Sequence, residues 1–281
     1  MPNKRNFFTV DDDIGGMIRR AAPDIGIRAI RIVPTGWTNI VAEAETDCGE
    51  YFFRFPRDGF WAEMLEKDCE FSQFVHGRTS FSTNLLSLFR DSGRIFSMHK
   101  KIPGNALSCV AGSLSESEAK VIADDISRFM IEIGAIPVSE IPEKCRMGLA
   151  EFLRRLGELH FEDKSMKYFH TFANHEKDIR VVHGDLNPGN IIIRNGRVGG
   201  IIDFCFAGPG PYAYSDLPWL CNRMPPAFRK TMLASFENMS GMRINPDTFE
   251  DFSKAWRFIG TEYIRFMRKC QPEIEIPGGD L

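Results

Sequence analysis

One stretch of the chain, residues 179–203, constrains the fold more than any other. It begins with IRVV, which predicts a short strand, and continues into the polar loop HGDLNPGN at 183–190. Two apolar runs follow, IIIR and RVGGIID, with Asn195-Gly196 between them. Asn-Gly between two apolar runs is the strongest short-range signal of a two-residue β-hairpin. The stretch therefore predicts a strand, a polar loop and a hairpin in succession.

The predicted hairpin brings two oxygen-bearing side chains to its open end. With the strands paired around the Asn-Gly turn, Asn190 lies opposite Ile201, and Asp203 shares the face of Asn190 because side chains alternate along a strand. Two such side chains can hold one Mg²⁺, with phosphate and water oxygens completing its shell. A bulge at Gly199-Gly200 would shift this register.

Asp185 lies five residues before Asn190, within the pattern His-x-Asp-Leu-x-x-x-Asn. This order, with Asp203-Phe204 after it, is the order of polar residues in the catalytic and metal-binding segments of kinases. There the aspartate orients the attacking hydroxyl and accepts its proton late, while positioning and metal electrostatics carry most of the rate. An isolated Asp-x-x-x-x-Asn is common in turns, so the order of all four residues makes the pattern specific.

The rest of the chain predicts an α+β fold with two lobes. Residues 1–99 predict a β-rich N-terminal lobe with one helix at about 61–76 and with strands at 28–36, 38–46, 50–56, 85–90 and 94–102. Residues 100–281 predict a mainly helical C-terminal lobe, interrupted by strands at 179–203. Its helix signals include a capping box from Ser115 to Glu118 and a long helix that starts at Asn245-Pro246.

Composition narrows the class of protein. A formal net charge of -3 argues against a nucleic-acid-binding protein, which usually carries a basic surplus. Seven widely spaced cysteines favour reduced thiols in a cytoplasmic protein over a disulfide framework or a zinc site. The acidic residues 11–13 stand where a signal peptide would be apolar, and no apolar run approaches the roughly 20 residues that span a bilayer. The oligomeric state stays open.

Residues 181–217, VVHGDLNPGNIII…GGIIDFCFAGPGPYAYSDL, resemble the aminoglycoside phosphotransferase family. This branch of the kinase-like superfamily also includes choline, homoserine and fructosamine kinases and macrolide phosphotransferases. The resemblance implies a bilobal protein-kinase-like fold and Mg²⁺-dependent transfer of the γ-phosphate of ATP or GTP to a small-molecule hydroxyl. It makes Asp185 the catalytic aspartate and Asn190 and Asp203 the Mg²⁺ ligands. His183 and Asp216 match positions that are structural in the family.

For the nucleotide, the resemblance implies two groups of contacts. Gly36 and Asn39, in GWTN, match a turn that covers the phosphates. His99, Lys100 and Ile102 match the hinge, whose backbone groups lie against the base.

Arg54, in YFFRFP, matches the strand lysine that holds the α- and β-phosphates. Arginine keeps the charge of lysine but not its shape, and the alternative is a solvated strand residue. Its expected partner on the next helix is Glu66, with Glu63 and Glu70 as rivals.

The acceptor stays open at this point. A polycationic aminoglycoside calls for an acidic pocket, but residues 217–245 contain one acid, Glu237, and four bases. A choline, sugar or amino-alcohol kinase of the same family is an alternative, as is a nucleotide-binding, pseudokinase-like module without turnover. The chain lacks the G-x-G-x-x-G and A-P-E segments of protein kinases, which argues against a protein substrate.

Overall fold

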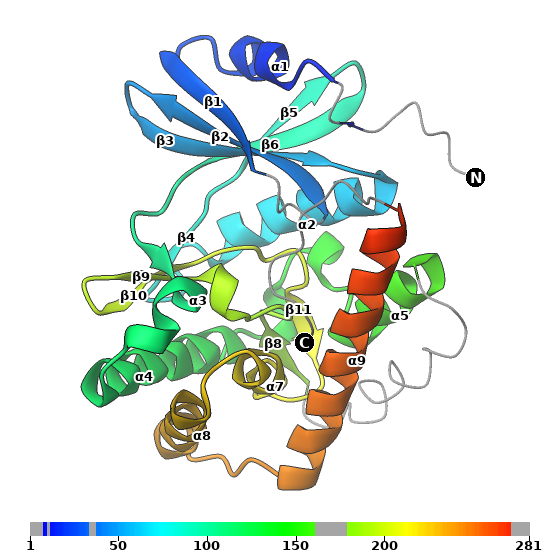
Figure 1. Ribbon diagram of the computed structural model, residues 1–281. Coiled ribbons are helices and arrows are strands. Elements are labelled where there is room, and N and C mark those ends of the chain that lie inside the picture. Colours follow the sequence, from blue (N-terminus) through cyan, green and yellow to red (C-terminus); the bar gives the residue numbers. More distant parts are fainter. Residues whose placement is uncertain (1–7, 10–11, 34–37, 161–178, 271–281) are drawn as a thin grey trace.

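The computed structural model describes residues 8–9, 12–33, 38–160 and 179–270, and it has two lobes (Figure 1). The N-terminal lobe contains an antiparallel sheet in the order β1-β2-β3-β6-β5. Its strands are β1 (Ile27–Val33), β2 (Asn39–Thr46), β3 (Gly49–Pro56), β6 (Arg94–Lys100) and β5 (Ser87–Asp91). Helix α1 (Ile14–Ala21) covers one face of the sheet, and α2 (Gly59–Val75) lies between the sheet and the C-terminal lobe (Figure 1).

The two faces of this sheet differ in chemistry because side chains alternate along each strand. Phe53 and Phe55 of β3 are buried toward α1, where Phe55 stacks on Phe96 of β6 with ring centroids 4.9 Å apart. Arg54 points to the opposite face and lies across from Ser97. The apolar face therefore stabilises the lobe, and the polar face is turned toward the second lobe.

The C-terminal lobe is mainly helical. Its helices are α3 (Leu107–Val110), α4 (Glu116–Gly134), α5 (Leu149–His160), α7 (Leu217–Asn222), α8 (Pro226–Ser240) and α9 (Pro246–Cys270). Two small sheets accompany them, formed by β4 (Ser82–Thr83), β10 (Arg197–Ile201), β9 (Ile191–Arg194) and β7 (Asn105–Ala106), and by β11 (Gly208–Gly210) with β8 (Arg180–Val182). A large apolar core joins α4 and α8 to the strands around the predicted loop.

The predicted strands and helices are present, with ends shifted by a few residues. The capping box forms between Ser115 and Glu118 at the start of α4, and the long C-terminal helix begins at Pro246. Helix α8 was not predicted, although it starts with Pro226, at a position where the missing amide proton of proline costs no hydrogen bond. The α+β fold class, with a β-rich N-terminal lobe and a mainly helical C-terminal lobe, is confirmed.

Two sequence expectations concern membrane-spanning helices and the cysteines. None of the described helices is both long and apolar enough to cross a membrane. The cysteines whose side chains are described are free thiols, as expected: Cys48, Cys69, Cys109, Cys145, Cys205 and Cys221.

Lys67 is an unusual residue of α2. Its side chain is only 2% exposed, and its Nζ has no hydrogen-bond partner among the residues that the structure describes. Burial lowers the pKa of Lys67 from 10.5 to about 8, because the charged form loses its hydration. Between these two values the unfolded chain binds the proton more tightly than the folded chain. Below pH 8 the buried lysine is charged, and the free energy of unfolding is lowered by the full amount. This loss of stability disappears as the pH rises toward 10.5.

We expect Lys67→Met to raise the free energy of unfolding at pH 7, because methionine fills the same space without a buried charge. At about 1.4 kcal/mol per pKa unit, the upper limit of the gain is roughly 3 kcal/mol. Chemical denaturation at pH 7 and near pH 10 would measure it, and the gain should shrink at the higher pH. Lys254→Met, on the exposed side of α9, is the control with little effect. A less stable Lys67→Met protein at pH 7 would contradict the expectation.

Candidate active site

The polar loop at residues 183–190 is held by the buried ring of His183. The Nε2–H of His183 donates to the carbonyl oxygen of Ile202 (3.0 Å), just beyond β10, and its Nδ1 accepts the amide of Asp185 (3.2 Å). Burial lowers the pKa of His183 to about 4, so the ring is neutral, as this hydrogen-bond pattern requires. His183 thus ties the loop to the segment that carries Asp203, which is the structural role expected for it.

The side chain of Asp216 holds the same loop by binding backbone amides of the loop. Its carboxylate accepts the amides of His183 (2.9 Å) and Gly184 (2.8 Å). Gly184 has a φ of +79°, and a Cβ at this position would lie 2.4 Å from the carbonyl oxygen of Phe206. Only glycine fits this turn without strain, so the position explains why the loop reads His-Gly-Asp.

Asp185 lies at the centre of the loop and is half-buried. Its Oδ1 accepts hydrogen bonds from Nε1 of Trp219 (2.6 Å) and Nδ2 of Asn187 (2.9 Å), and its Oδ2 accepts one from Nδ2 of Asn190 (3.1 Å). Burial raises the pKa of Asp185 to about 6, with the charge of Asp203 acting in the same direction and the bonds from Asn187 and Trp219 opposing it. The carboxylate is therefore oriented by three donors before any ligand binds.

Asn190 ends a short 3₁₀ turn, Pro188–Asn190, and its amide nitrogen faces Asp185. Besides the bond to the carboxylate, Nδ2 donates to the backbone carbonyl of Asp185 (2.9 Å). Its oxygen, Oδ1, accepts no hydrogen bond within the described part of the chain. An amide oxygen in this state is a suitable ligand for a hard cation.

Arg54 links the lobes at this point. Its guanidinium forms a buried ion pair with Asp68 of α2 and a second contact, 3.3 Å from Nη1 to Oδ1, with Asp203. Burial disfavours its charge, but the two carboxylates outweigh this effect and raise the pKa of Arg54. Asp68 also accepts the amide of Phe204 (2.9 Å), so one carboxylate connects α2, β3 and the segment after β10.

The predicted pairing of Arg54 with Glu66 is wrong. Glu66 lies on the solvent side of α2 and pairs with Arg90 (3.2 Å) and Lys144 (3.6 Å). The rival Glu63 pairs instead with Arg155. The helical period contains the signal that identifies Asp68, since it falls in the buried stripe of α2. That stripe includes Trp61, Met64, Leu65, Asp68, Phe71, Ser72 and Val75.

The predicted hairpin register is also wrong by one residue at its open end. Arg194 pairs with Arg197 as expected, but Ile201 lies opposite Ile191 because the ladder shifts between Val198 and Gly200. The amide of Ile202 donates to the carbonyl of Asn190 (3.0 Å). Asp203 then leaves the strand with a left-handed φ of +68°, and its side chain is 35% exposed. A turn of the backbone, and not strand alternation, places this carboxylate beside Arg54.

The polar face of the N-terminal sheet carries unsatisfied groups that lie near Arg54. Within the described part of the chain, four buried atoms on this face have no hydrogen-bond partner: Asn39 Oδ1, Arg54 Nε, Ser97 Oγ and His99 Nδ1. Burial, with the charge of Arg54, lowers the pKa of His99 to about 3, so its ring is neutral. Buried polar atoms without partners are costly, which makes this face a candidate for binding a polar ligand.

The other expected nucleotide contacts have different environments. Gly36 lies outside the described residues. The Lys100 side chain is exposed and belongs to the opposite face of the sheet from His99, since it pairs with Tyr51. Ile102 packs against Gly200 of β10, where a Cβ would lie 2.8 Å from its Cδ1. The side chains of Lys100 and Ile102 therefore lie apart from the four buried atoms without partners. Any contact of these two residues with a nucleotide would come from their backbones.

Trp219 is a site residue that the sequence does not identify. It lies in α7, in the sequence SDLPWL, and only the folded chain brings it to Asp185. The sequence contains no spacing rule that connects a residue of one helix to a loop 34 positions earlier.

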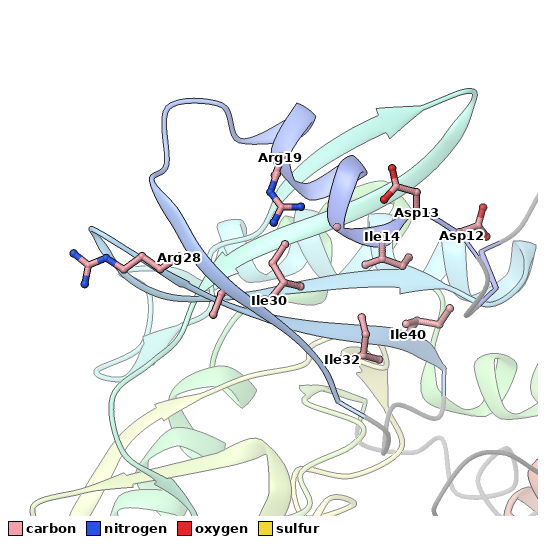
Figure 2. Close-up of a pocket in the computed structure, with 10 residues that line it drawn as sticks. Asp12, Asp13, Ile14, Arg19, Arg28, Ile30, Ile32 and Ile40 are labelled. Carbon is pink, nitrogen blue, oxygen red and sulfur yellow. The ribbon is translucent and has the colours of Figure 1, made fainter.

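A separate pocket lies on the other side of the N-terminal sheet (Figure 2). It has a volume of about 580 Å³ and lies between α1 and β1, with Arg28 near one end, Asp12 and Asp13 near the other, and Arg19 between them. Its floor includes Ile40, which belongs to the same sheet face as Phe55 and not to that of Arg54. The pocket is therefore distinct from the site around Asp185.

The chain matches a known protein family. The model of the phosphotransferase enzyme family matches residues 29–252, a range that includes Arg54, Asp68, Asp185, Asn190 and Asp203. No curated protein sequence matches the chain.

Several solved structures share the fold. A GDP and kanamycin complex of the aminoglycoside phosphotransferase APH(2″)-IIIa superposes with a TM-score of 0.70 at 20% identity, over 92% of this chain and 94% of that one. The macrolide 2′-phosphotransferase MphH of Brachybacterium faecium gives 0.65 at 14% identity, over 95% and 100%. A streptomycin–ATP complex of APH(2″)-IIa gives 0.63 at 17%, also over 95% and 100%.

We expect Asp68→Asn to destabilise the protein by about 3 kcal/mol, because it leaves Arg54 buried with a donor in place of its anionic partner. Glu66→Gln, two residues earlier on α2, is the matched control, since its partners are exposed and such pairs contribute less than about 1 kcal/mol. Urea denaturation of the two variants would compare them. Equal losses of stability would mean that the Arg54–Asp68 pair is no more important than a surface ion pair.

Proposed function

Because this chain belongs to the phosphotransferase enzyme family, we propose that it transfers the γ-phosphate of ATP or GTP to a hydroxyl of a small molecule. The observation that carries the proposal is the convergence of Asp185, Asn190, Asp203 and Arg54, which come from both lobes. The carboxylate of Asp203 is the meeting point, since it contacts Arg54 (3.3 Å) and its charge raises the pKa of Asp185.

In this reaction Asp185 orients the acceptor hydroxyl. The hydroxyl oxygen forms a bond to the γ-phosphorus, the bond from that phosphorus to its bridging oxygen breaks, and the nucleoside diphosphate leaves. The hydroxyl proton passes to Asp185. Its donors Trp219, Asn187 and Asn190 fix the orientation of the carboxylate, and such positioning supplies much of the rate in phosphoryl transfer.

The donor set suits a magnesium–nucleotide. Asn190 Oδ1 and the partly exposed carboxylate of Asp203 are oxygen ligands of the kind that Mg²⁺ prefers, and Mg²⁺ commonly takes one or two protein ligands plus phosphates and water. Within the described residues no cluster of three or more His, Cys, Asp or Glu side chains could hold a metal without such help. Bound there, Mg²⁺ would neutralise charge on the phosphates.

The nucleotide itself would bind against the polar face of the N-terminal sheet. Arg54 lies beside Asp203 and offers a fixed positive charge for phosphates, while Asp68 keeps it in place. The unpartnered atoms of Asn39, Ser97 and His99 supply further polar contacts. A division of the chain after residue 99, with the backbone of Lys100 and Ile102 as the hinge, would place the base next to this face.

Two alternatives have less support. A pseudokinase-like module without turnover would need none of the oriented groups around Asp185, yet all of them are present. Choline, sugar or amino-alcohol kinases share the donor chemistry and differ in the acceptor, which lies on the other side of Asp185. A cytoplasmic location, where nucleotides and reduced thiols occur together, agrees with the free cysteines.

We expect Asp185→Asn to retain binding of the magnesium–nucleotide but to lose phosphoryl transfer by about 10²–10⁴-fold, because the amide accepts no proton from the hydroxyl. Coupled measurement of nucleoside diphosphate release in the presence of an acceptor would test this. Asp251→Asn, an exposed change on α9, is the control and should keep parental turnover. Equal turnover of Asp185→Asn and the parent protein would refute the mechanism.

A second test concerns Asp203. In the parent protein, ATP or GTP with Mg²⁺ at about 100 times its Kd should add roughly 2.7 kcal/mol of stability and raise Tm. Asp203→Ala should lose this Mg²⁺-dependent increase, since it removes the carboxylate ligand. Thermal unfolding with and without Mg²⁺ measures the effect, with Asp251→Ala as control. An unchanged Mg²⁺-dependent shift in Asp203→Ala would exclude Asp203 as a ligand.

A further inference from the structure

Arg223 is the residue of the candidate site that the reaction above leaves unexplained. It follows α7 directly, and its guanidinium lies over the ring of Trp219, with Cζ 3.9 Å from the ring centroid. Trp219 in turn donates to Asp185 (2.6 Å). Arg223 is thus one side chain away from the carboxylate that would orient the acceptor hydroxyl.

Arg223 is half-buried, and its guanidinium has no hydrogen-bond acceptor among the described residues. Its Nε is buried without a partner, and no ion pair or side-chain hydrogen bond of Arg223 forms within the described residues. Burial lowers the pKa of Arg223, and the negative charge of Asp185 acts against this effect. A buried donor without an acceptor is costly, so a ligand that supplies the acceptor is favoured at this position.

Other basic residues nearby are satisfied in different ways. Arg257 donates to Asn222 (3.2 Å) and pairs with Glu250 (3.1 Å), and Arg243 pairs with Glu237 (3.6 Å). Arg229 lies over the ring of Phe249, 5.1 Å from its centroid. Arg223 differs because its flat face is used by Trp219 while its Nε edge is not bonded. That edge presents two parallel N–H groups, the geometry that binds a carboxylate or phosphate in a bidentate manner.

The side chains around Trp219 are packed and hydrogen-bonded, so Arg223 lies on an ordered part of the structure. Trp219 stacks on Trp256 of α9, with ring centroids 4.9 Å apart, and both rings are buried. Asn222, next to Arg223, bonds Ser253 of α9 in both directions (2.8 and 3.1 Å). The segment that carries Arg223 is therefore fixed to α9.

We propose that Arg223, held on Trp219, is an anion-binding subsite for the acceptor, so that the acceptor carries a carboxylate, sulfate or phosphate close to the hydroxyl that is phosphorylated. This inference rests on the proposed phosphotransferase function and narrows its substrate class. An ammonium group at the same place would meet the charge of Arg223 at short range, which disfavours a polycationic acceptor.

The test uses sets of ligands that share a carbon skeleton and differ in charge: gluconate, glucose and glucosamine, then glycerate, glycerol and 3-amino-1,2-propanediol, with 3-phosphoglycerate and kanamycin added. Binding to the full-length protein without nucleotide is followed by tryptophan fluorescence, since Trp219 lies under Arg223. Nucleoside diphosphate release with ATP and with GTP is then measured for each ligand.

We expect at least one anionic ligand to bind and to be phosphorylated with a kcat/KM at least tenfold above its neutral and cationic counterparts. Arg223→Gln should raise KM for that ligand by roughly 10–100-fold, as expected for the loss of a charge-assisted hydrogen bond, while Kd for the nucleotide stays the same. Arg223→Lys should rescue part of the loss. Arg229→Gln is the matched control and should behave like the parent protein.

The outcomes separate the two proposals. No saturable binding of any anionic ligand, a preference for the amines or kanamycin, or an anion affinity unchanged in Arg223→Gln would overturn the subsite. Weaker nucleotide binding in Arg223→Gln, with the acceptor unaffected, would assign Arg223 to the phosphates of the donor and also overturn it. Failure of the parent protein to bind magnesium–nucleotide would instead refute the proposed function. The fluorescence titration would still show whether the anion-binding subsite exists.

Discussion

One guanidinium, that of Arg54, joins the two lobes at the candidate active site. It lies on the sheet face that is turned toward the C-terminal lobe, and it contacts Asp68 of α2 and Asp203 after β10. A buried cation is tolerated only if anions surround it, so the positions of α2 and of the segment after β10 depend on each other. In the proposed reaction, the same charge would also bind the phosphates of the nucleotide.

Much of this arrangement was predictable from local sequence. The Asn195-Gly196 turn, the strands around it and the polar loop before it depend on neighbouring residues, and these were placed correctly. The capping box of α4 is equally local. The family resemblance added the catalytic order of Asp185, Asn190 and Asp203, whose chemical roles remain proposals that the geometry supports.

The errors had two sources: backbone irregularities that a strand pattern alone does not settle, and a helical pattern whose signal was overlooked. The bulge before Gly200 shifts the hairpin register by one residue. The left-handed backbone conformation of Asp203 nevertheless places its carboxylate in the site. Asp68 was overlooked in favour of Glu66, although its place in the apolar stripe of α2 marks it as the inward residue. Trp219 and Arg223 required the tertiary structure, because only the packing of α7 on α9 brings them to Asp185.

The clamp on the polar loop has a mechanical consequence. His183 bonds the carbonyl of Ile202, and Asp216 bonds the backbone of His183 and Gly184, so the loop, the end of the hairpin and α7 behave as one rigid body. A movement of the N-terminal lobe would therefore leave the distances among Asp185, Asn190 and Trp219 unchanged. It would instead break two contacts between the lobes, the 3.3 Å contact of Arg54 with Asp203 and the 2.9 Å hydrogen bond from the amide of Phe204 to Asp68.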